Sequence, residues 1–349
     1  MKNWLIYGAN GYTGRLIALQ AKSLGLQPIL AGRGAEIQRI GAETGFVVRQ
    51  FDLSNQAASS KALADVQLVL NCAGPFSATA APMLQACLAA GAHYLDISGE
   101  HSVFEHAHSL HEAAQRAGVV ICPGVGFDVV PTDCVALALK AAMPDAIELT
   151  LGFDTASGLS PGTSKTMLEN LAAGGKVREN GLLRSVPNAY KKRICDFGYG
   201  PKWAMTIPWG DVVTAYYSTG IANISVYVPT PKLLIQLMRG LDGLRPAFAW
   251  PWLQRGLTLL INRWVKGPTA QQRASLRTAV WGEVRNAQGQ VKTARIETSN
   301  GYELTIHSAL HVVQWLLANP QPAGYCTPAQ MLGWQLIEQL PGSSKLYIS

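Results

Sequence analysis

The sequence has few charged residues and few cysteines for its length. Charged residues make up 15% of the 349 residues, whereas 48% are hydrophobic, a balance typical of globular rather than disordered proteins. The net charge is +7, but no long basic run carries it, which argues against nucleic acid as a partner. The length is sufficient for two domains that each have a core.

Cysteine pairs and long hydrophobic runs are also missing. The six cysteines include no C-x-x-C pair, so we expect free thiols rather than a zinc cluster or disulfides. No stretch reaches the roughly 18 consecutive apolar residues of a membrane-spanning helix. The opening run MKNWLIYG is too short for a signal peptide. These absences predict a cytoplasmic protein without a metal site.

Three glycines near the amino terminus form the most informative motif. Gly8, Gly11 and Gly14 follow the apolar run WLIY at residues 4–7, and a helical pattern begins among them. Glycine adopts positive φ without strain and lets a ligand approach the backbone, and the N–H groups at a helix start bind phosphate. The motif therefore predicts a dinucleotide-binding turn. An ordinary tight turn between a strand and a helix is the alternative.

The second expected strand ends without an acidic residue. It covers residues 28–31 and is followed by Gly32 and Arg33. NAD-selective sites place a carboxylate here for the ribose 2′-hydroxyl, whereas the guanidinium of arginine suits a 2′-phosphate. The sequence therefore predicts NADP as the cofactor, with Arg33 at the phosphate. A solvated loop cation is the alternative role for Arg33.

Strands alternate with helices over the first third of the chain. We expect six strands, at residues 4–7, 28–31, 46–51, 67–71, 94–97 and 119–122. This alternation predicts an α/β fold, a Rossmann-type doubly wound parallel sheet spanning residues 1–135. Ligands of such sheets lie beyond the carboxyl ends of the strands, so the loops after the strands are expected to share one crevice.

These loops supply the candidate site residues. Asp52 is expected to accept a hydrogen bond from adenine or, like Ser54, to cap the next helix. Ala73, Gly74, Pro75 and Phe76 form a small-residue turn, whose backbone we expect to pass close to the ribose or nicotinamide. The chain has no Tyr-x-x-x-Lys motif, so another group must supply a proton. The candidate catalytic residues are Tyr94, Asp96, Glu100, His101 and Asp128, of which Asp96 and Asp128 have loop fixing or helix capping as an alternative role.

Four histidines lie close together in the sequence, at positions 101, 106, 108 and 111. They fall on or just before a helix expected at residues 103–116, which also carries Glu105 and Glu112. We expect solvated side chains rather than metal ligands, because a lone histidine-rich helix face lacks the spacing of a typical zinc site.

The second half predicts an α+β domain over residues 136–307, for substrate binding or dimerisation. An antiparallel sheet is expected from strands at residues 145–154, 221–228, 276–285, 291–298 and 302–307, the last entered through the turn Asn300-Gly301. A capping box at Thr327 begins a further helix. Helices in residues 308–349 are expected to complete the first domain.

Residues 231–266 combine leucine and tryptophan with basic residues. Asp242 is the single acid among six cations, which are Lys232, Arg239, Arg245, Arg255, Arg263 and Lys266. Such composition at helical spacing is typical of a segment at a membrane surface or over an apolar substrate. The alternative is a helical pair that covers the sheet of the second domain or forms a homodimer contact.

The chain resembles the saccharopine dehydrogenase-like oxidoreductases, and within them the trans-acting enoyl reductase and saccharopine dehydrogenase-like branch. The motifs that carry the resemblance are GANGYTGRL at 8–16, AGR at 31–33, NCAGPF at 71–76, YLDISGE at 94–100, GVGFDVVPTD at 124–133 and TPAQMLG at 327–333. The resemblance implies hydride transfer, with the turn 73–76 near the nicotinamide. The residues that it implies in NADP binding are Gly8, Asn10, Gly11, Tyr12, Thr13, Gly14 and Arg33.

Two functions fit these observations. The favoured one is an NADP-dependent reductase that acts on an unsaturated or imine bond, with a lipid-like molecule as one candidate substrate. The alternative is a non-catalytic module that holds NADP and binds a partner or a membrane surface. What separates them is a proton donor that faces the nicotinamide.

Overall fold

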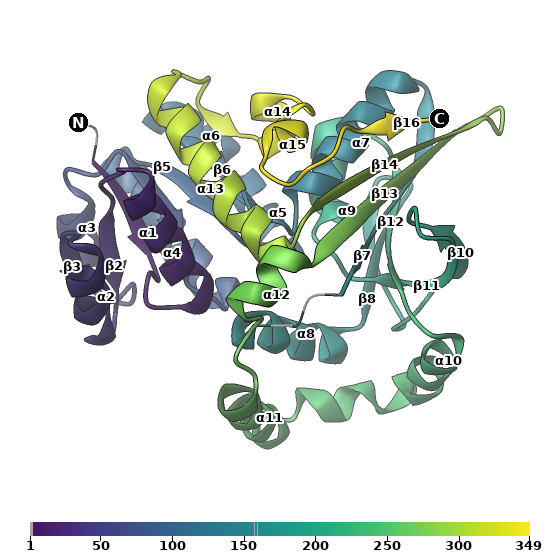
Figure 1. The fold of residues 1–349 in the computed structure, drawn as a ribbon, viewed down its shortest axis with the longest axis horizontal. Helices are drawn as coiled ribbons and strands as arrows, with labels where there is room; N and C mark the ends of the chain where they lie inside the picture. The colour runs from purple at the N-terminus through teal and green to yellow at the C-terminus, as the bar shows by residue number, and fades with distance from the viewer. Residues whose placement is uncertain (1–2, 157, 159) are drawn as a thin grey trace. The chain divides into compact units, whose positions relative to one another are not determined.

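The computed structural model describes residues 3–156, 158 and 160–349, so the first two residues of the MKNWLIYG run lie outside the described residues. The chain divides into two compact units (Figure 1). Unit 1 contains the described residues up to Val130 together with Tyr302–Met331, and unit 2 contains Pro131–Gly301 and Leu332–Ser349.

Unit 1 is built on a parallel sheet, which confirms the predicted Rossmann-type architecture. Within the described residues the sheet has seven strands in the order β15-β6-β5-β4-β1-β2-β3. The strands are β1 (Trp4–Tyr7), β2 (Ile29–Gly32), β3 (Val48–Gln50), β4 (Leu68–Asn71), β5 (His93–Asp96), β6 (Val120–Cys122) and β15 (Gly324–Tyr325). The order reverses between β1 and β4, where doubly wound sheets bind their ligands.

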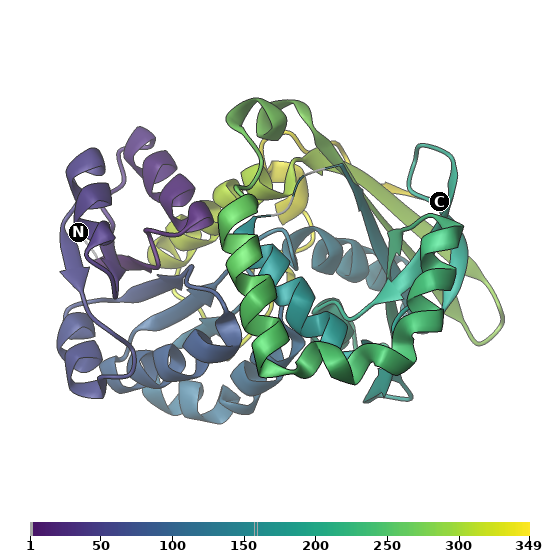
Figure 2. The same ribbon diagram turned by 90° about the horizontal axis from the view of Figure 1, so that it is seen from below.

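Helices cover both faces of this sheet (Figure 2). They are α1 (Tyr12–Ser23), α2 (Glu36–Thr44), α3 (Gln56–Leu63), α4 (Phe76–Ala90), α5 (His101–Ser109), α6 (His111–Ala117), α13 (Gly301–Ala318) and α14 (Pro328–Leu332). All four residues of β1 and all four of β4 are buried, because a central parallel strand packs against helices on both sides. The core of unit 1 therefore fixes the carboxyl ends of its strands rigidly.

Unit 2 contains a mixed sheet, mostly antiparallel. β7 and β12 pair in parallel, and the main path runs β10-β11-β12-β7-β13-β14-β16, with β8 and β9 attached beside β12. The strands are β7 (Ala146–Thr155), β8 (Gly175–Glu179), β9 (Leu182–Val186), β10 (Lys192–Asp196), β11 (Pro201–Ile207), β12 (Asn223–Pro229), β13 (Arg277–Asn286), β14 (Val291–Ser299) and β16 (Tyr347–Ile348). The long β13–β14 hairpin has the predicted position.

The helices of unit 2 are α7 (Val130–Ala142), α8 (Pro161–Ala173), α9 (Asp211–Thr219), α10 (Lys232–Leu241), the 3-10 helix η1 (Asp242–Ala249), α11 (Pro251–Trp264), α12 (Ala270–Ser275) and α15 (Leu336–Gln339). Of these, α9 and α12 are not predicted from the sequence. The strands from β8 to β11 are also unpredicted, because their apolar residues alternate weakly. Leu182 and Ile194, for example, are more than half exposed.

Two sequence expectations differ from the structure near the carboxyl terminus. Residues 302–307, expected as a strand, form the start of α13, whose buried residues include Leu304, Ala309 and Val312 at helical spacing. Of residues 308–349, expected to complete the first domain, those up to Met331 belong to unit 1, whereas Leu332–Ser349 belong to unit 2, where β16 pairs with β14. The capping box at Thr327 is present, but α14 is short because Gly333 has a φ of +81°.

The histidine and cysteine expectations have different outcomes. His101, His106, His108 and His111 are partly buried rather than solvated, since α6 packs on β15 and the His111 Nδ1 accepts the Tyr325 N–H at 3.0 Å. Among the described residues, no group of three or more metal-binding side chains comes together.

The six cysteines are free thiols. No helix in the described part of the chain is both long and apolar enough to span a bilayer.

Candidate dinucleotide and proton-donor site in unit 1

The glycine turn after β1 has the geometry that its sequence predicts. Gly8 has a φ of +81°, and its N–H donates to the Ala31 carbonyl at 2.8 Å. A Cβ on Gly8 would lie 2.7 Å from the backbone nitrogen of Ala73, and a Cβ on Gly14 would overlap the Gly8 carbonyl oxygen. The two glycines therefore allow the turn, α1 and the loop after β4 to approach one another closely.

The start of α1 is open to solvent and carries no acidic residue. Gly11 is the N-cap, and the first turn of α1 contains Tyr12, Thr13 and Gly14. Asn10 and Gly11 are exposed, and the Asn10 side chain lies against Gly32 at the end of β2. Uncapped N–H groups at a helix start attract phosphate, so the predicted residues 8–14 fit a pyrophosphate.

Arg33 and Asp52 occupy neighbouring loops at the ends of β2 and β3. Both side chains are exposed, and the Gln50 side chain fixes the first loop by donating to the Arg33 carbonyl at 3.0 Å. Hydrogen bonds from Ser54 lower the pKa of the Asp52 carboxyl, and the positive charge of Arg33 lowers it further. Neither Asp52 nor Ser54 caps α3, because Asn55 is its N-cap and accepts the Ala58 N–H.

Asn71 and Thr79 hold the turn after β4, and the sequence analysis missed both. The buried Asn71 side chain accepts the Ala73 N–H at 3.1 Å and donates to the Thr79 hydroxyl at 3.3 Å. Thr79 in turn donates to the Ala73 carbonyl at 2.5 Å. A polar residue at the end of an apolar strand is the sequence signal that identifies Asn71. The turn of residues 73–76, which contains a cis bond before Pro75, thereby has a fixed backbone.

Glu100 caps α4 from the loop after β5. Its carboxylate accepts the Phe76 N–H at 3.0 Å and the Ser77 N–H at 2.7 Å, and the side chain is only 8% exposed. A carboxylate at a helix N-terminus interacts favourably with the helix dipole. Glu100 therefore joins the loops after β4 and β5.

Tyr94 and Asp96 form a buried network below these loops. The Tyr94 hydroxyl donates to Asp96 Oδ2 at 2.7 Å, while Asp96 Oδ1 accepts the backbone N–H groups of Ser98 and Gly124 at 2.9 and 2.8 Å. Burial raises the pKa of Asp96 to about 6, against the lowering effect of these hydrogen bonds. The network ties the end of β5 to the loop after β6.

Asp128 differs from the other acidic candidates because the residue as a whole is partly exposed. A Cβ on Gly99 would lie 2.6 Å from Asp128 Oδ2, so glycine leaves room for this carboxyl group beside the Glu100 loop. Burial, followed by the negative charge of Glu100, raises the pKa of Asp128 to about 7. A group with this pKa exchanges protons readily at neutral pH.

Two side chains of α13 hold the Asp128 loop, and the sequence analysis missed these as well. The Thr305 hydroxyl accepts the Phe127 N–H at 3.0 Å, and the Ser308 hydroxyl donates to the Val125 carbonyl at 2.7 Å. Their partners are about 180 residues away in the chain, so no local pattern reveals them. His101, the remaining acid–base candidate, begins α5 and is partly buried.

The parallel sheet, its switch point and the glycine turn define unit 1 as a Rossmann-type domain, the class of domain that binds dinucleotides. Comparison with known proteins shows what this unit is similar to. Residues 4–122 match the family model of the saccharopine dehydrogenase NADP binding domain. The match covers the strands from β1 to β6, including the loops that carry Arg33, the Ala73–Phe76 turn and Glu100.

Curated relatives carry related names, in agreement with the predicted resemblance. The saccharopine dehydrogenase-like oxidoreductase of Rattus norvegicus is 29% identical over 53% of this chain and 48% of its own length. A protein named as a trans-acting enoyl reductase in Mycobacterium tuberculosis is 33% identical over 48% of this chain and 44% of its own length. The matches thus span about half the length of these curated relatives.

A solved structure shares the fold of the whole chain. Apo saccharopine dehydrogenase (L-Glu forming) from Saccharomyces cerevisiae superimposes with a TM-score of 0.69 and covers 100% of both chains. Its sequence is only 12% identical, so this likeness establishes the fold alone.

Proposed function

We propose that the protein is an NADP-dependent oxidoreductase that reduces an unsaturated or imine bond. The observation that carries the proposal is the approach of Gly8 to Ala73 beside the open start of α1, which leaves room for a dinucleotide at the switch point of the sheet. Residues 8–14 and the turn of residues 73–76 would hold the cofactor, whose nicotinamide would supply a hydride to one atom of the double bond. The protein then has to supply a proton to the other atom.

The residues after β2 support NADP over NAD. Arg33 is exposed and forms no ion pair with any described carboxylate. The sequence AGR at the end of β2 contains no acid that would repel a 2′-phosphate. Asp52 would accept a hydrogen bond from the adenine amino group in the neighbouring loop.

Asp128 is the proposed proton donor. Glu100 is engaged by two backbone N–H groups, and Tyr94 and Asp96 are fully buried in a network with each other. Asp128 is partly exposed and has a pKa near neutrality. We therefore assign proton transfer to Asp128 and the positioning of loops to the other three residues.

The names of the relatives guide the choice of substrates to test. An enoyl reductase acts on a carbon–carbon double bond, and a saccharopine dehydrogenase-like name directs attention to imines. We propose the class of enoyl or imine substrates, including lipid-like enoyl thioesters, for this protein. NADPH oxidation in the presence of each compound measures turnover.

Calorimetric titration with NADPH and NADH tests the cofactor assignment. We expect Arg33→Ala to lower the affinity for NADPH at least about tenfold, because one charge-assisted contact is lost. The affinity for NADH should change by no more than about twofold. Lys61→Ala, at an exposed cation of α3, serves as the matched control. Equal losses for the two cofactors would contradict phosphate recognition by Arg33.

Turnover by Asp128→Asn separates an enzyme from a module that only holds NADP. We expect this variant to bind NADPH normally and to lose at least about a hundredfold in reduction rate. If the wild-type protein binds NADPH but oxidises it with no member of the enoyl and imine panel, the non-catalytic module becomes the better description.

A further inference from the structure

A segment of unit 2 presents apolar side chains to solvent. Helices α10 and α11, joined by η1, form a continuous arm over residues 232–264 (Figures 1 and 2). In α10, Leu233, Leu237 and Leu241 follow at four-residue spacing and are 78%, 54% and 46% exposed. Residues at this spacing lie on one face of a helix, so the outer face of α10 is an apolar stripe.

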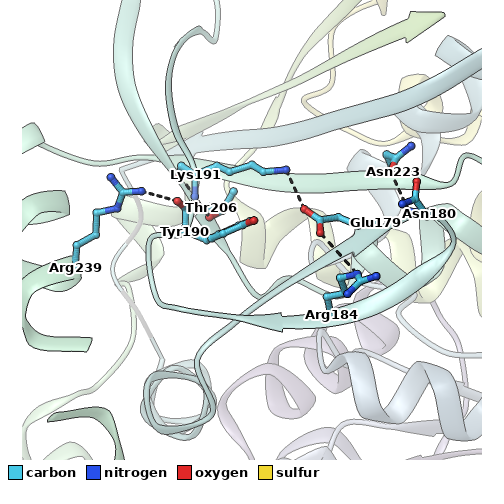
Figure 3. Close-up of polar contacts among 8 residues, drawn as sticks. All are labelled: Glu179, Asn180, Arg184, Tyr190, Lys191, Thr206, Asn223 and Arg239. Carbon is cyan, nitrogen blue, oxygen red and sulfur yellow. Dashed lines mark hydrogen bonds and ion pairs between the residues drawn. The ribbon is translucent and has the colours of Figure 1, made fainter. Parts of the chain in front are cut away.

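The opposite face of α10 is fixed to the sheet of unit 2. Ile235 is fully buried in a cluster with Ala189 and Met205. Arg239 donates from Nε to the Ala189 carbonyl at 2.9 Å. It also donates from Nη2 to the Tyr190 carbonyl at 2.6 Å (Figure 3). The helix is thus anchored by one face, and the leucine stripe remains on the other.

Tryptophan and leucine extend the apolar surface along α11. Trp252, Leu259 and Trp264 are 66%, 69% and 73% exposed. Trp250, just before the helix, is also more than half exposed, and its ring lies 5.9 Å from that of Trp252. Tryptophan is enriched where an apolar phase meets water, because its ring is largely apolar and carries one polar N–H.

The arm carries a strong positive charge that no ion pair among the described residues neutralises. The one acid, Asp242, accepts the Asn188 N–H at 2.8 Å. On the nearby sheet, Glu179 pairs with both Lys191 and Arg184 (Figure 3). In contrast, no described carboxylate forms an ion pair with the basic residues of the arm and its end, which are Lys232, Arg239, Arg245, Arg255, Arg263 and Lys266.

We infer that this arm is a docking surface for an anionic lipid bilayer. The leucine stripe and the tryptophans would enter the interface between head groups and acyl chains, while the exposed cations of α11, Arg255 and Arg263, contact lipid phosphates. A second copy of the chain would bring one set of six cations against another, so charge complementarity favours a negatively charged partner. The inference concerns unit 2 and does not depend on the proposed reaction.

Flotation of the full-length protein with vesicles tests the inference. Wild-type protein is expected to float with phosphatidylcholine vesicles containing about one third phosphatidylglycerol and at least about tenfold less with phosphatidylcholine alone. Raising the salt concentration from about 0.05 M to about 0.5 M should reduce the bound fraction through charge screening. NADPH affinity, measured on the same samples, reports whether unit 1 is intact.

Two double variants of the arm identify the groups responsible. We expect Trp252→Ser with Trp264→Ser, and separately Arg255→Glu with Arg263→Glu, to lower vesicle binding at least about tenfold. Exposed residues of unit 1 supply the matched controls. Leu24→Ser with Val47→Ser controls for the loss of exposed apolar side chains. Lys61→Glu with Arg116→Glu controls for the reversal of two positive charges. The melting temperature of each variant shows whether it is folded.

Three outcomes would overturn the inference. They are absence of wild-type flotation at low salt, equal flotation of arm variants and controls, and a wild-type dimer that the arm variants convert to monomers. In the last case the stripe is an interface between copies of the chain. Binding to an acidic protein but not to vesicles would likewise reject the lipid surface.

Discussion

Gly8 is subject to two separate constraints, and a pair of variants distinguishes them. It has positive φ, and a Cβ there would meet the Ala73 backbone at 2.7 Å. Gly25 also has positive φ, +69°, but a Cβ there meets no described atom within 4 Å. We expect Gly25→Ala to cost about 1 kcal/mol of unfolding free energy and Gly8→Ala about 2–4 kcal/mol.

Urea unfolding and NADPH titration measure these effects. Gly8→Ala should also lower the affinity for NADPH, because moving the turn away from Ala73 changes the backbone proposed to face the pyrophosphate. Gly25→Ala should bind NADPH as the wild-type protein does. The site would not require the close approach of residue 8 to the Ala73 backbone if both variants lost the same unfolding free energy and both kept the wild-type affinity for NADPH.

The acidic pair Glu100 and Asp128 predicts a specific pH dependence. The folded pKa of Asp128, about 7, is raised above its ordinary value of 3.8, so the folded protein binds this proton more tightly than the unfolded chain. Its contribution to stability is present below about pH 4 and is lost as the pH rises through 7. With Asp128 as the proposed proton donor, the rate of reduction should also fall above pH 7.

Carboxyl carbon NMR titration of aspartate-labelled protein measures this pKa. Asp128→Asn should remove the transition near pH 7. Glu100→Gln should lower the pKa of Asp128, because it removes a neighbouring negative charge while one amide oxygen still accepts a helix N–H. A pKa of Asp128 that stays the same in Glu100→Gln would contradict the electrostatic coupling.

Local chemistry explains which site residues the sequence can identify. Gly8, Gly14 and Arg33 sit next to recognisable strand ends, so their spacing alone suggests their location. The position of Glu100 in a loop is equally visible, but its bonds to Phe76 and Ser77 are not. Such partners depend on how neighbouring strands align in the sheet, which a single sequence does not specify.

Among the structural elements, β5 and the loop after β6 depend on Asp96. Replacing it with alanine leaves the buried N–H groups of Ser98 and Gly124 without an acceptor. Each unsatisfied N–H group costs about 1–3 kcal/mol of unfolding free energy. We expect Asp96→Ala to lower the free energy of unfolding by about 3–5 kcal/mol. Asp96→Asn retains the Oδ1 acceptor and can donate to the Tyr94 hydroxyl. We therefore expect it to lower the free energy of unfolding by only about 1 kcal/mol. Urea denaturation at pH 7.5 compares them, and equal losses would contradict this role.

The elements predicted correctly are those with strong local patterns. The Rossmann-type strands of unit 1 are short apolar runs that end at glycine or polar residues. Residues 302–307 were misleading because Asn300-Gly301 is also a common hairpin turn, while the helical spacing of buried residues in α13 becomes clear only over its full length. The edge strand β9 has no buried residue and β10 has one, Cys195, so alternation does not reveal them.

At the scale of the whole molecule, the two units are expected to respond to different ligands. Hydrogen exchange on the full-length protein can follow both in one experiment. NADPH should protect the amides of residues 8–14 and 71–76, because the ligand contacts this backbone and stabilises the surrounding loops. Anionic vesicles should protect residues 232–264 without changing the first two segments.

Variants should separate the two responses. Arg33→Ala is expected to remove NADPH protection at residues 8–14 while retaining vesicle protection of the arm, and Trp252→Ser with Trp264→Ser should do the reverse. This reciprocal result follows because the cofactor residues and the exposed stripe belong to different units. Loss of both responses in either variant would show that the two sites are energetically coupled, since ligands at independent sites do not alter each other's affinity.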